Sequence, residues 1–170
     1  MVGFLFCPYC REKLQENKLQ YHCPKCGKTI YKHPSLTASI LPVMDNKVLL
    51  GKRGIEPKKG GLDTIGGFLN YGEQPREGAV REGFEELGVK VKIKELLGIY
   101  PDSYYYQGLN QKTLNFFYLA EIKDIDKIKP QDDIKSIKWY PIDNLRKKVA
   151  FVCVTKALRD LRFWYKSKHH

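Results

Sequence analysis

Three glutamates, Glu82, Glu85 and Glu86, occur within five consecutive residues of the segment REGFEELG. On an α-helix successive side chains are about 100° apart, so these carboxylates would project from one side. Like charges on one helix face are destabilising, and the neighbouring Arg81 alone cannot neutralise three of them. Hard divalent cations such as Mg2+ and Mn2+ bind clusters of carboxylate oxygens. The spacing therefore indicates a divalent-metal site, with a solvated acidic face as the alternative.

The remainder of the chain is strongly basic. Its 170 residues include 30 Lys+Arg and 19 Asp+Glu, a formal net charge of +11, although residues 73–88 hold five acids against two arginines. A basic surface favours anionic partners such as nucleotides, other phosphates or nucleic acid. The alternative is an ordinary lysine-rich surface, because scattered charge is usually only solvated.

Four cysteines form two C-x2-C pairs, CPYC and CPKC, separated by twelve residues. Two such pairs complete the tetrahedral four-sulfur site that zinc prefers, and four protein ligands leave no open position for catalysis. Disulfides or a redox centre are the alternatives, but cytosolic disulfides are rare. The sequence therefore predicts structural zinc on Cys7, Cys10, Cys23 and Cys26. The fifth cysteine, Cys153, lies in an apolar helical pattern and is expected to be a buried small side chain.

The elements that must position these residues follow from hydrophobic periodicity. Residues 1–33 are predicted to form a small zinc ribbon and residues 34–170 a layered α/β domain. Strands are predicted at 36–44, 47–53, 89–100, 113–122 and 134–140, with a hairpin turn at Asp45-Asn46. Helices are predicted at 75–87, from Pro75 in the first turn to Gly88 as the stop, and at 154–166.

A glycine-rich segment, residues 58–72, is expected to be a loop that precedes the glutamate helix. Its Gly66 and Gly67 would let the backbone approach a metal or a phosphate at the start of the helix, because glycine carries no Cβ.

The order Gly67, Glu73, Arg81-Glu82, Glu85-Glu86 and Gly88-Val89 resembles the Nudix box, G-x5-E-x7-R-E-U-x-E-E-x-G-U, where U is a bulky apolar residue. The single departure is Gly83 at the first U position, which is expected to loosen the packing under the helix. A four-cysteine ribbon ahead of such a domain is similar to the zinc-ribbon Nudix hydrolases, which include NADH pyrophosphatases. The resemblance implies a Nudix-type α/β/α sandwich with a mixed sheet behind the ribbon.

The resemblance also implies an activity. Nudix enzymes hydrolyse the pyrophosphate of a nucleoside diphosphate linked to another group, using Mg2+ or Mn2+. The ligands implied for the cation are three carboxylates and one carbonyl: Glu82, Glu85, Glu86 and Gly66. Glu73 would be an outer or second-metal ligand. Either Glu82 or Glu86 would be the base, and Arg81 would orient the glutamates by charge-assisted hydrogen bonds.

Further site residues are expected outside the box. Family members often add a carboxylate from a late loop, and Asp133 lies at a comparable position, with Asp132 and Glu121 as rivals. Candidate substrate contacts are a cation for phosphate and two aromatic rings for a base: Arg53, Tyr105 and Tyr106.

The substrate implied is ADP-ribose-like, a dinucleotide or a nucleotide sugar. The S-Q-P-W-type motif of NADH pyrophosphatases is not present in GIYPDSYYYQG, while Pro101 resembles the downstream proline of ADP-ribose-type members. A nucleotide- or RNA-binding regulatory module and an RNA cap-nucleotide hydrolase are the alternatives. Nucleic acid and a homodimer are compatible with the sequence but not required by it. The apolar opening MVGFLF carries no basic leader and no stretch is long enough for a membrane span, so a cytoplasmic protein is expected.

Overall fold

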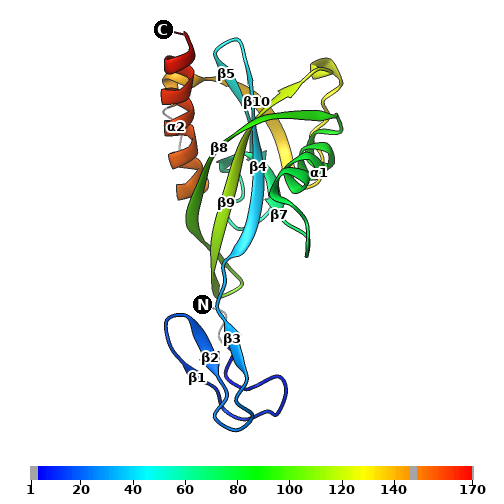
Figure 1. The fold of residues 1–170 in the computed structure, drawn as a ribbon. Helices are drawn as coiled ribbons and strands as arrows, with labels where there is room; N and C mark the ends of the chain where they lie inside the picture. The colour runs from blue at the N-terminus through cyan, green and yellow to red at the C-terminus, as the bar shows by residue number, and fades with distance from the viewer. Residues whose placement is uncertain (1–3, 146–148, 170) are drawn as a thin grey trace.

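The computed structural model describes residues 4–145 and 149–169, and His169 by its backbone only. Within these residues the chain forms a small sheet and then a larger one (Figure 1). The small antiparallel sheet contains β1 (Gln15–Glu16), β2 (Gln20–His22) and β3 (Thr29–Tyr31). It falls inside the predicted ribbon, while the division of the chain into residues 1–33 and 34–170 stays a prediction.

The larger sheet has seven strands within the described ranges, in the order β10-β5-β4-β9-β8, with β6 beside β5 and β7 beside β4. The strands are β4 (Ser35–Met44), β5 (Lys47–Arg53), β6 (Leu62–Asp63), β7 (Ile65–Phe68), β8 (Val91–Tyr106), β9 (Leu109–Ile122) and β10 (Ile134–Pro141). The β4–β9 pair is parallel and the other pairs are antiparallel, so the sheet is mixed.

Two helices cover opposite faces of this sheet, α1 (Pro75–Leu87) and α2 (Val152–His169) (Figure 1). Alternate residues of β4 face the two helices, because side chains alternate along a strand. Ile40 belongs to the apolar core under α1, and Leu41 belongs to the core under α2. Short 3-10 turns, η1 (Ile125–Lys127) and η2 (Ile142–Asn144), flank β10. The expected α/β/α sandwich with a mixed sheet is confirmed.

The predicted hairpin turn and the predicted ends of the first helix are both confirmed at the exact residues. The hairpin between β4 and β5 turns at Asp45 and Asn46, whose φ angles of 48° and 56° suit the residue types that tolerate left-handed backbone. Helix α1 begins at Pro75 and ends before Gly88, which has a φ of 69° and donates its N–H to the Phe84 carbonyl over 2.8 Å. A left-handed glycine cap closes the helix without steric cost.

The expectation that Gly83 loosens the packing is wrong. Gly83 is buried, and a Cβ on it would lie 3.0 Å from both Ile40 Cδ1 and Val91 Cγ2. The helix therefore approaches the sheet closely at this position, and the neighbouring strands fill the space that a larger side chain would occupy. Close approach offsets the low helix propensity of glycine.

The glycine-rich segment is not simply a loop. Residues 62–63 and 65–68 form β6 and β7, and Gly66 and Gly67 of β7 pair with Ser39 and Ala38 of β4. A Cβ on Gly66, whose φ is 150°, would lie 2.3 Å from the Ala38 carbonyl oxygen. Glycine is required there because β7 lies directly against β4, which fixes the segment beside α1.

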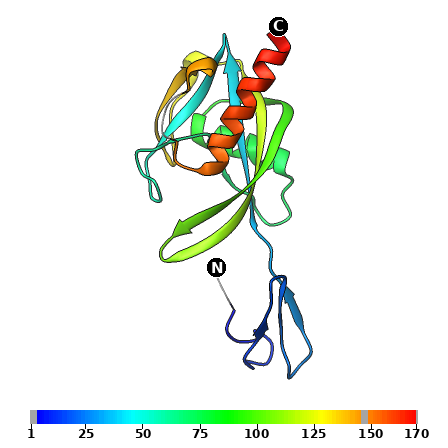
Figure 2. The same cartoon turned by 90° about the vertical axis from the view of Figure 1, so that its left-hand side faces the viewer.

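Strands β8 and β9 extend beyond their predicted ends. They form a long hairpin that pairs down to Tyr106 and Leu109 and turns at Gln107-Gly108, with φ angles of 49° and 77°. Pairing partners that lie far apart in sequence decided this length. The hairpin tip projects toward the ribbon (Figure 2). No helix in the described residues is long and apolar enough to cross a membrane.

Candidate active site

Arg81 on α1 holds three glutamates together. Its guanidinium donates to both carboxylate oxygens of Glu73 (2.8 Å each), to Glu82 Oε1 (2.7 Å) and to Glu85 Oε2 (2.9 Å). A further bond to the Phe68 carbonyl (3.1 Å) ties the group to β7. Charge-assisted bidentate pairs are strong and directional, so the network fixes the carboxylates relative to the helix. The hydrogen bonds from Arg81 lower the pKa of Glu73 to about 2.

Glu86 faces the sheet instead of Arg81. Its Oε2 accepts the Gly66 N–H over 2.7 Å, and the residue is only 4% exposed. Burial raises the pKa of Glu86 to about 9, and the charges of Glu82, Asp63 and Asp133 add to the effect. A buried carboxylate beside three others is costly to ionise without a cation.

Gly67 explains how Glu82 reaches the same region. A Cβ on Gly67 would lie 2.7 Å from both Glu82 carboxylate oxygens, so only glycine leaves room for that side chain against β7. Burial raises the pKa of Glu82 as well, although Arg81 opposes the shift.

Asp133 is brought to the cluster by the end of α1. The carbonyls of Leu87 and Glu86 accept the N–H groups of Lys129 and Gln131, which satisfies helix-terminal acceptors and draws residues 129–134 to the helix. Asp133 is half-buried, and desolvation raises its pKa while Arg53 lowers it. Asp132, a rival, is exposed. The other rival, Glu121, forms an exposed ion pair with Lys94 at the far end of β9.

A pocket adjoins the glutamates on the α2 side of the sheet. Arg53 lines it, with its guanidinium 2.9 Å from Asp63 Oδ2 and 5.2 Å from the centre of the Phe151 ring. The Phe151 ring is stacked on Tyr104, with centroids 5.8 Å apart and planes at 26°. Asp63 is buried, and desolvation raises its pKa against the opposing effect of Arg53. The pocket thus offers a cation and flat aromatic faces beside the carboxylates.

The predicted substrate contacts are only partly brought together. Arg53 lines the pocket, but Tyr105 and Tyr106 do not, and they are 64% and 42% exposed. Tyr104 takes that place, and it also meets Phe68 edge-on at 5.4 Å. Phe151 and Asp63 were missed. No sequence pattern marked Phe151, since it only precedes the last helix, whereas a lone acid among glycines could have drawn attention to Asp63.

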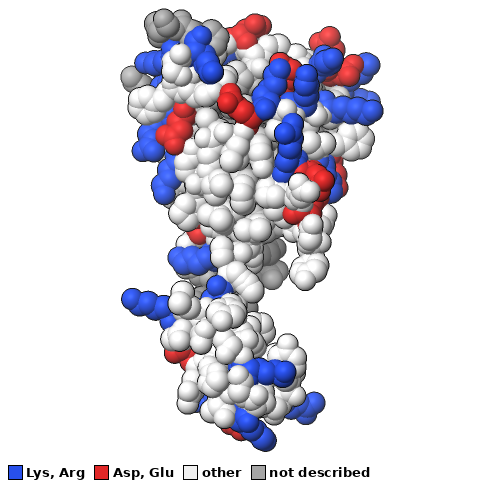
Figure 3. All heavy atoms as spheres, viewed as in Figure 1, with Lys and Arg blue, Asp and Glu red and all other residues white. Residues whose placement is uncertain are grey.

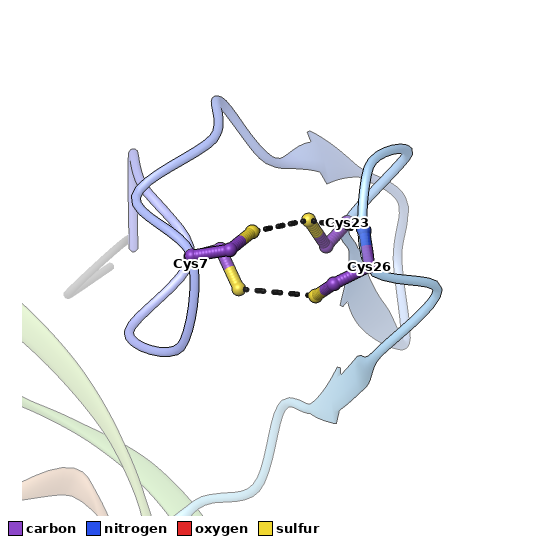
Figure 4. Close-up of side chains that lie close together, drawn as sticks. Cys7, Cys23 and Cys26 are labelled. Atoms are coloured by element: carbon purple, nitrogen blue, oxygen red, sulfur yellow. Dashed lines mark hydrogen bonds between the residues drawn. The ribbon is translucent and has the colours of Figure 1, made fainter.

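The four ribbon cysteines form a second cluster (Figure 4). Cys7 and Cys26 have their sulfurs 3.7 Å apart, and Cys10 and Cys23 have theirs 3.4 Å apart. A tetrahedron with bonds of about 2.3 Å to sulfur has edges of about 3.8 Å, so the quartet fits one tetrahedral metal ion. The separations are too long for disulfides, and all five cysteines are free. Cys153 is buried, as expected.

The cysteines are already arranged with their ligand atoms close together, whereas the carboxylates are not. The ligand atoms of all four cysteines lie within 4.8 Å of one another, and the part of the chain that the structure describes holds no other such group of three or more. The glutamates share hydrogen bonds with Arg81 and Gly66 instead. Their hard oxygen donors, and the raised pKa of Glu86, nevertheless fit a divalent cation.

Comparison with known proteins agrees with this geometry. Residues 33–158 match the NUDIX domain, so the chain belongs to the NUDIX family. The family, the fold class and the expected class of enzyme, a Nudix pyrophosphohydrolase, are confirmed. Nudix hydrolases generally need a divalent metal.

Among individual proteins, the chain is 33% identical over 137 residues to an ADP-ribose pyrophosphatase of Methanocaldococcus jannaschii, covering 79% of this chain and 77% of that protein. It is 29% identical over 162 residues to the NAD-capped RNA hydrolase NudC of Pseudomonas aeruginosa, covering 92% of this chain but only 54% of that one. A NUDIX hydrolase structure from Nitrosomonas europaea superposes with a TM-score of 0.75 at 25% identity, over 98% of this chain and 93% of that chain.

Proposed function

We propose that the protein is a Mg2+- or Mn2+-dependent pyrophosphohydrolase that cleaves the diphosphate of an adenosine diphosphate linked to another group. The observation that carries the proposal is the network in which Arg81 fixes Glu73, Glu82 and Glu85 beside the pocket of Arg53 and Tyr104. The names of the two relatives support the substrate class, since ADP-ribose and an NAD cap both contain an ADP moiety.

The relatives do not support the two substrates equally. The chain spans about three quarters of the length of the ADP-ribose pyrophosphatase but about half the length of the NudC proteins. ADP-ribose is therefore the first substrate proposed, and an ADP-linked group carried on RNA is the second.

The residue roles follow from the contacts. Glu82, Glu85 and Glu86, with the Gly66 carbonyl and Asp133, are the proposed ligands of the divalent cation. The cation would neutralise charge on the diphosphate and lower the pKa of a bound water. Glu82 or Glu86 would accept the proton of the attacking water at a carboxylate oxygen.

Arg81 and Glu73 are proposed to position the other groups. Glu73 Oε1 is taken by Arg81, and Oε2 accepts both Arg81 and the Asn70 N–H, so this carboxylate orients the guanidinium. That role replaces the outer or second-metal ligand expected for Glu73 from the sequence. Arg53 would contact a phosphate, and the faces of Tyr104 and Phe151 would bind the adenine or the linked group.

Zinc is the ion proposed for the four cysteines, because four thiolates in a closed tetrahedron are typical of structural zinc. The backbone N–H of Cys26, bonded to the Cys23 sulfur at 3.5 Å, lowers the pKa of Cys23 to about 7, which favours the thiolate there. A backbone hydrogen bond from Glu12 lowers the pKa of Cys10, but desolvation and the hydrogen bonds with the other three cysteines raise it to about 12, so a cation is needed to hold all four as thiolates. A cytoplasmic location and a homodimer stay predictions.

The test is turnover with Mg2+ or Mn2+ on ADP-ribose, NADH, NAD+, dinucleoside polyphosphates, nucleotide sugars and nucleoside triphosphates. Wild type should hydrolyse ADP-linked diphosphates, and Glu86→Gln should lose activity by about a hundredfold or more. Glu77→Gln, an exposed glutamate on the same helix, should keep it. If wild type hydrolyses none of these substrates, the proposal is wrong and a nucleotide- or RNA-binding module is favoured.

A further inference from the structure

A groove lies between the ribbon and the tip of the β8–β9 hairpin. Figure 2 shows this hairpin tip extending toward the ribbon. We call it the junction groove. Its lining residues come from both sheets and from the connection between them: Phe4, Lys18, Tyr21, Tyr31, Lys32, His33, Pro34, Asn110, Gln111 and Lys112. None of the roles proposed above uses this groove.

The junction groove is cationic. Its lining includes three lysines and one histidine and no aspartate or glutamate. Lys32 is already paired with Glu16 and bonded to the Asn17 carbonyl at 2.6 Å. Lys18 and Lys112 are exposed, and among the described residues the hydrogen bond of the Lys112 ammonium goes to the neutral Ser103 hydroxyl at 2.8 Å. Lysine and arginine side chains surround the ribbon and its junction with the body, with few acids among them on the face in Figure 3. The groove therefore favours a polyanion.

Aromatic rings accompany these lysines. Tyr31 is 66% exposed, and Phe4 is 51% exposed and meets Tyr21 edge-on at 5.9 Å. Exposed rings beside lysines are the combination by which proteins bind single-stranded nucleic acid, because bases stack on the rings and phosphates follow the cations.

Tyr21 supplies an independent sign of a ligand. It is only 3% exposed, and its ring is fixed by Phe4 and by the Lys32 ammonium 4.6 Å from its centre. Its hydroxyl nevertheless finds no hydrogen-bond partner within the described residues. A buried polar group without a partner is costly, so a polar ligand in the groove that Tyr21 lines would satisfy it.

The junction groove and the active-site pocket lie along the same strand, β9. Gln111 lines the groove, and Thr113 and Asn115, on the same face of the strand, line the pocket. Residues two apart in a strand are separated by about 7 Å. Across the hairpin, Lys112 of the groove pairs with Ser103 of the pocket. This spacing places the groove within reach of a strand whose 5′ end lies in the pocket.

We propose that the junction groove binds single-stranded RNA whose 5′-terminal, ADP-linked nucleotide occupies the active-site pocket. The bases stack on Tyr31 and Phe4, Lys18 and Lys112 contact phosphates, and the Tyr21 hydroxyl bonds a polar atom of the bound strand. The proposal rests on the proposed function for what lies in the pocket, but the groove can be tested without catalysis.

The test uses full-length, zinc-loaded protein carrying Glu86→Gln and a labelled single-stranded RNA of about ten nucleotides with an ADP-linked 5′ end. Lys18→Glu with Tyr31→Ala should weaken binding about tenfold or more and flatten its salt dependence. The matched control, Lys13→Glu with Tyr9→Ala, makes the same changes on the ribbon outside the groove, where Tyr9 is 67% exposed, and should weaken binding much less. Tyr21→Phe keeps the ring and should weaken binding a few-fold.

Catalysis separates a binding role from a structural one. In protein that keeps Glu86, the double substitution Lys18→Glu with Tyr31→Ala (the groove pair) should lower kcat/KM for the capped RNA. It should leave kcat/KM for ADP-ribose unchanged. Equal RNA binding by the groove pair and the control pair would overturn the proposal, and so would parallel loss on ADP-ribose. If no substrate is hydrolysed but RNA binding falls only in the groove pair, the proposed function fails and the groove stands.

Discussion

The four cysteines of the ribbon come from two short turns. The carboxylates come from α1 itself, from the loop between β7 and α1, and from the residue just before β10. The cysteine ligand atoms already lie together, while the glutamates are hydrogen-bonded to Arg81 and to the Gly66 N–H. A local motif fixes its geometry through the turn itself, but a dispersed site depends on the packing of every element that contributes to it. The two sites should therefore respond differently to metal removal and to substitution.

The largest effect expected is loss of the ribbon on zinc removal. Structural zinc contributes on the order of 10 kcal/mol to the folding of small domains. The ribbon core has few buried residues, among them Leu14 and Tyr21. Hydrogen exchange should show residues 4–33 losing protection with a zinc chelator while the larger sheet keeps it.

Withdrawal of Mg2+ provides the control and should change exchange in neither region. Amides in residues 4–33 that stay protected without zinc would show that the ribbon folds independently of its metal, and the contrast between the two sites would disappear.

Arg81→Lys should have the next largest effect. A lysine ammonium cannot bond Glu73 through two parallel N–H groups while also reaching Glu82 and Glu85. Misplaced carboxylates should lower kcat/KM by about a hundredfold, as displaced catalytic groups commonly do. Steady-state kinetics on the best substrate measure this.

The same substitution at Arg76, on the same helix but outside the network, should be nearly silent, since it bonds only the Ile93 carbonyl at 3.4 Å. Comparable losses for both arginines would mean that the network around Arg81 does not set the geometry.

Gly83→Leu probes the close approach of α1 to the sheet. A side chain at this position meets Ile40 and Val91, so overpacking should destabilise the body by about 1–3 kcal/mol, even though bulky residues are typical of the family here. Urea unfolding followed by the fluorescence of Trp139 and Trp164 reports on the body alone, because the ribbon has no tryptophan.

Val80→Leu, an exposed position of the same helix, is the matched control and should change the free energy of unfolding little. A Gly83→Leu protein as stable as wild type would show that the helix can shift outward at little cost.

Glu86→Gln should stabilise the protein in Mg2+-free, zinc-loaded form. Because folding raises the pKa of Glu86 from 4.5 to about 9, the folded state binds this proton more tightly than the unfolded state. Wild type should therefore lose more stability than the variant as the pH rises from about 4.5 to 9. The gain near pH 9 should be on the order of a few kcal/mol, because each unit of pKa shift corresponds to about 1.4 kcal/mol.

Thermal unfolding of both proteins across this pH range tests the prediction, with Glu77→Gln as the control. If the stability of wild type and of Glu86→Gln changes with pH in parallel, folding does not raise the pKa of Glu86. A gain in stability with a loss of turnover would mark Glu86 as a residue kept for function.

Several features were readable from local sequence. Two C-x2-C pairs predict one site because each turn is short, and α1 was bounded correctly because Pro75 and Gly88 act within a few residues. The three helix glutamates share one side for the same reason, since helical periodicity alone places them.

Other features depended on strand pairing. Tyr104 of β8 lines the pocket, whereas Tyr105 and Tyr106 lie outside it. Successive side chains of a strand point to opposite faces. Which face meets the pocket depends on the register of β8 with β9, and no tyrosine encodes that register. The β7 strand was missed because its two glycines have weak strand propensity, and its pairing with β4 overrides that preference.

The sequence by itself determined the chemistry available to this protein: four thiolates at zinc spacing, three carboxylates on one helix side, and one arginine among them. Only the tertiary structure decided that Glu73 faces Arg81, that Glu86 lies buried against Gly66, and that Asp63, Tyr104 and Phe151 line one pocket. The physical reason is range. Turns and helices are specified by neighbouring residues, whereas burial and strand register arise from contacts between residues far apart in the chain.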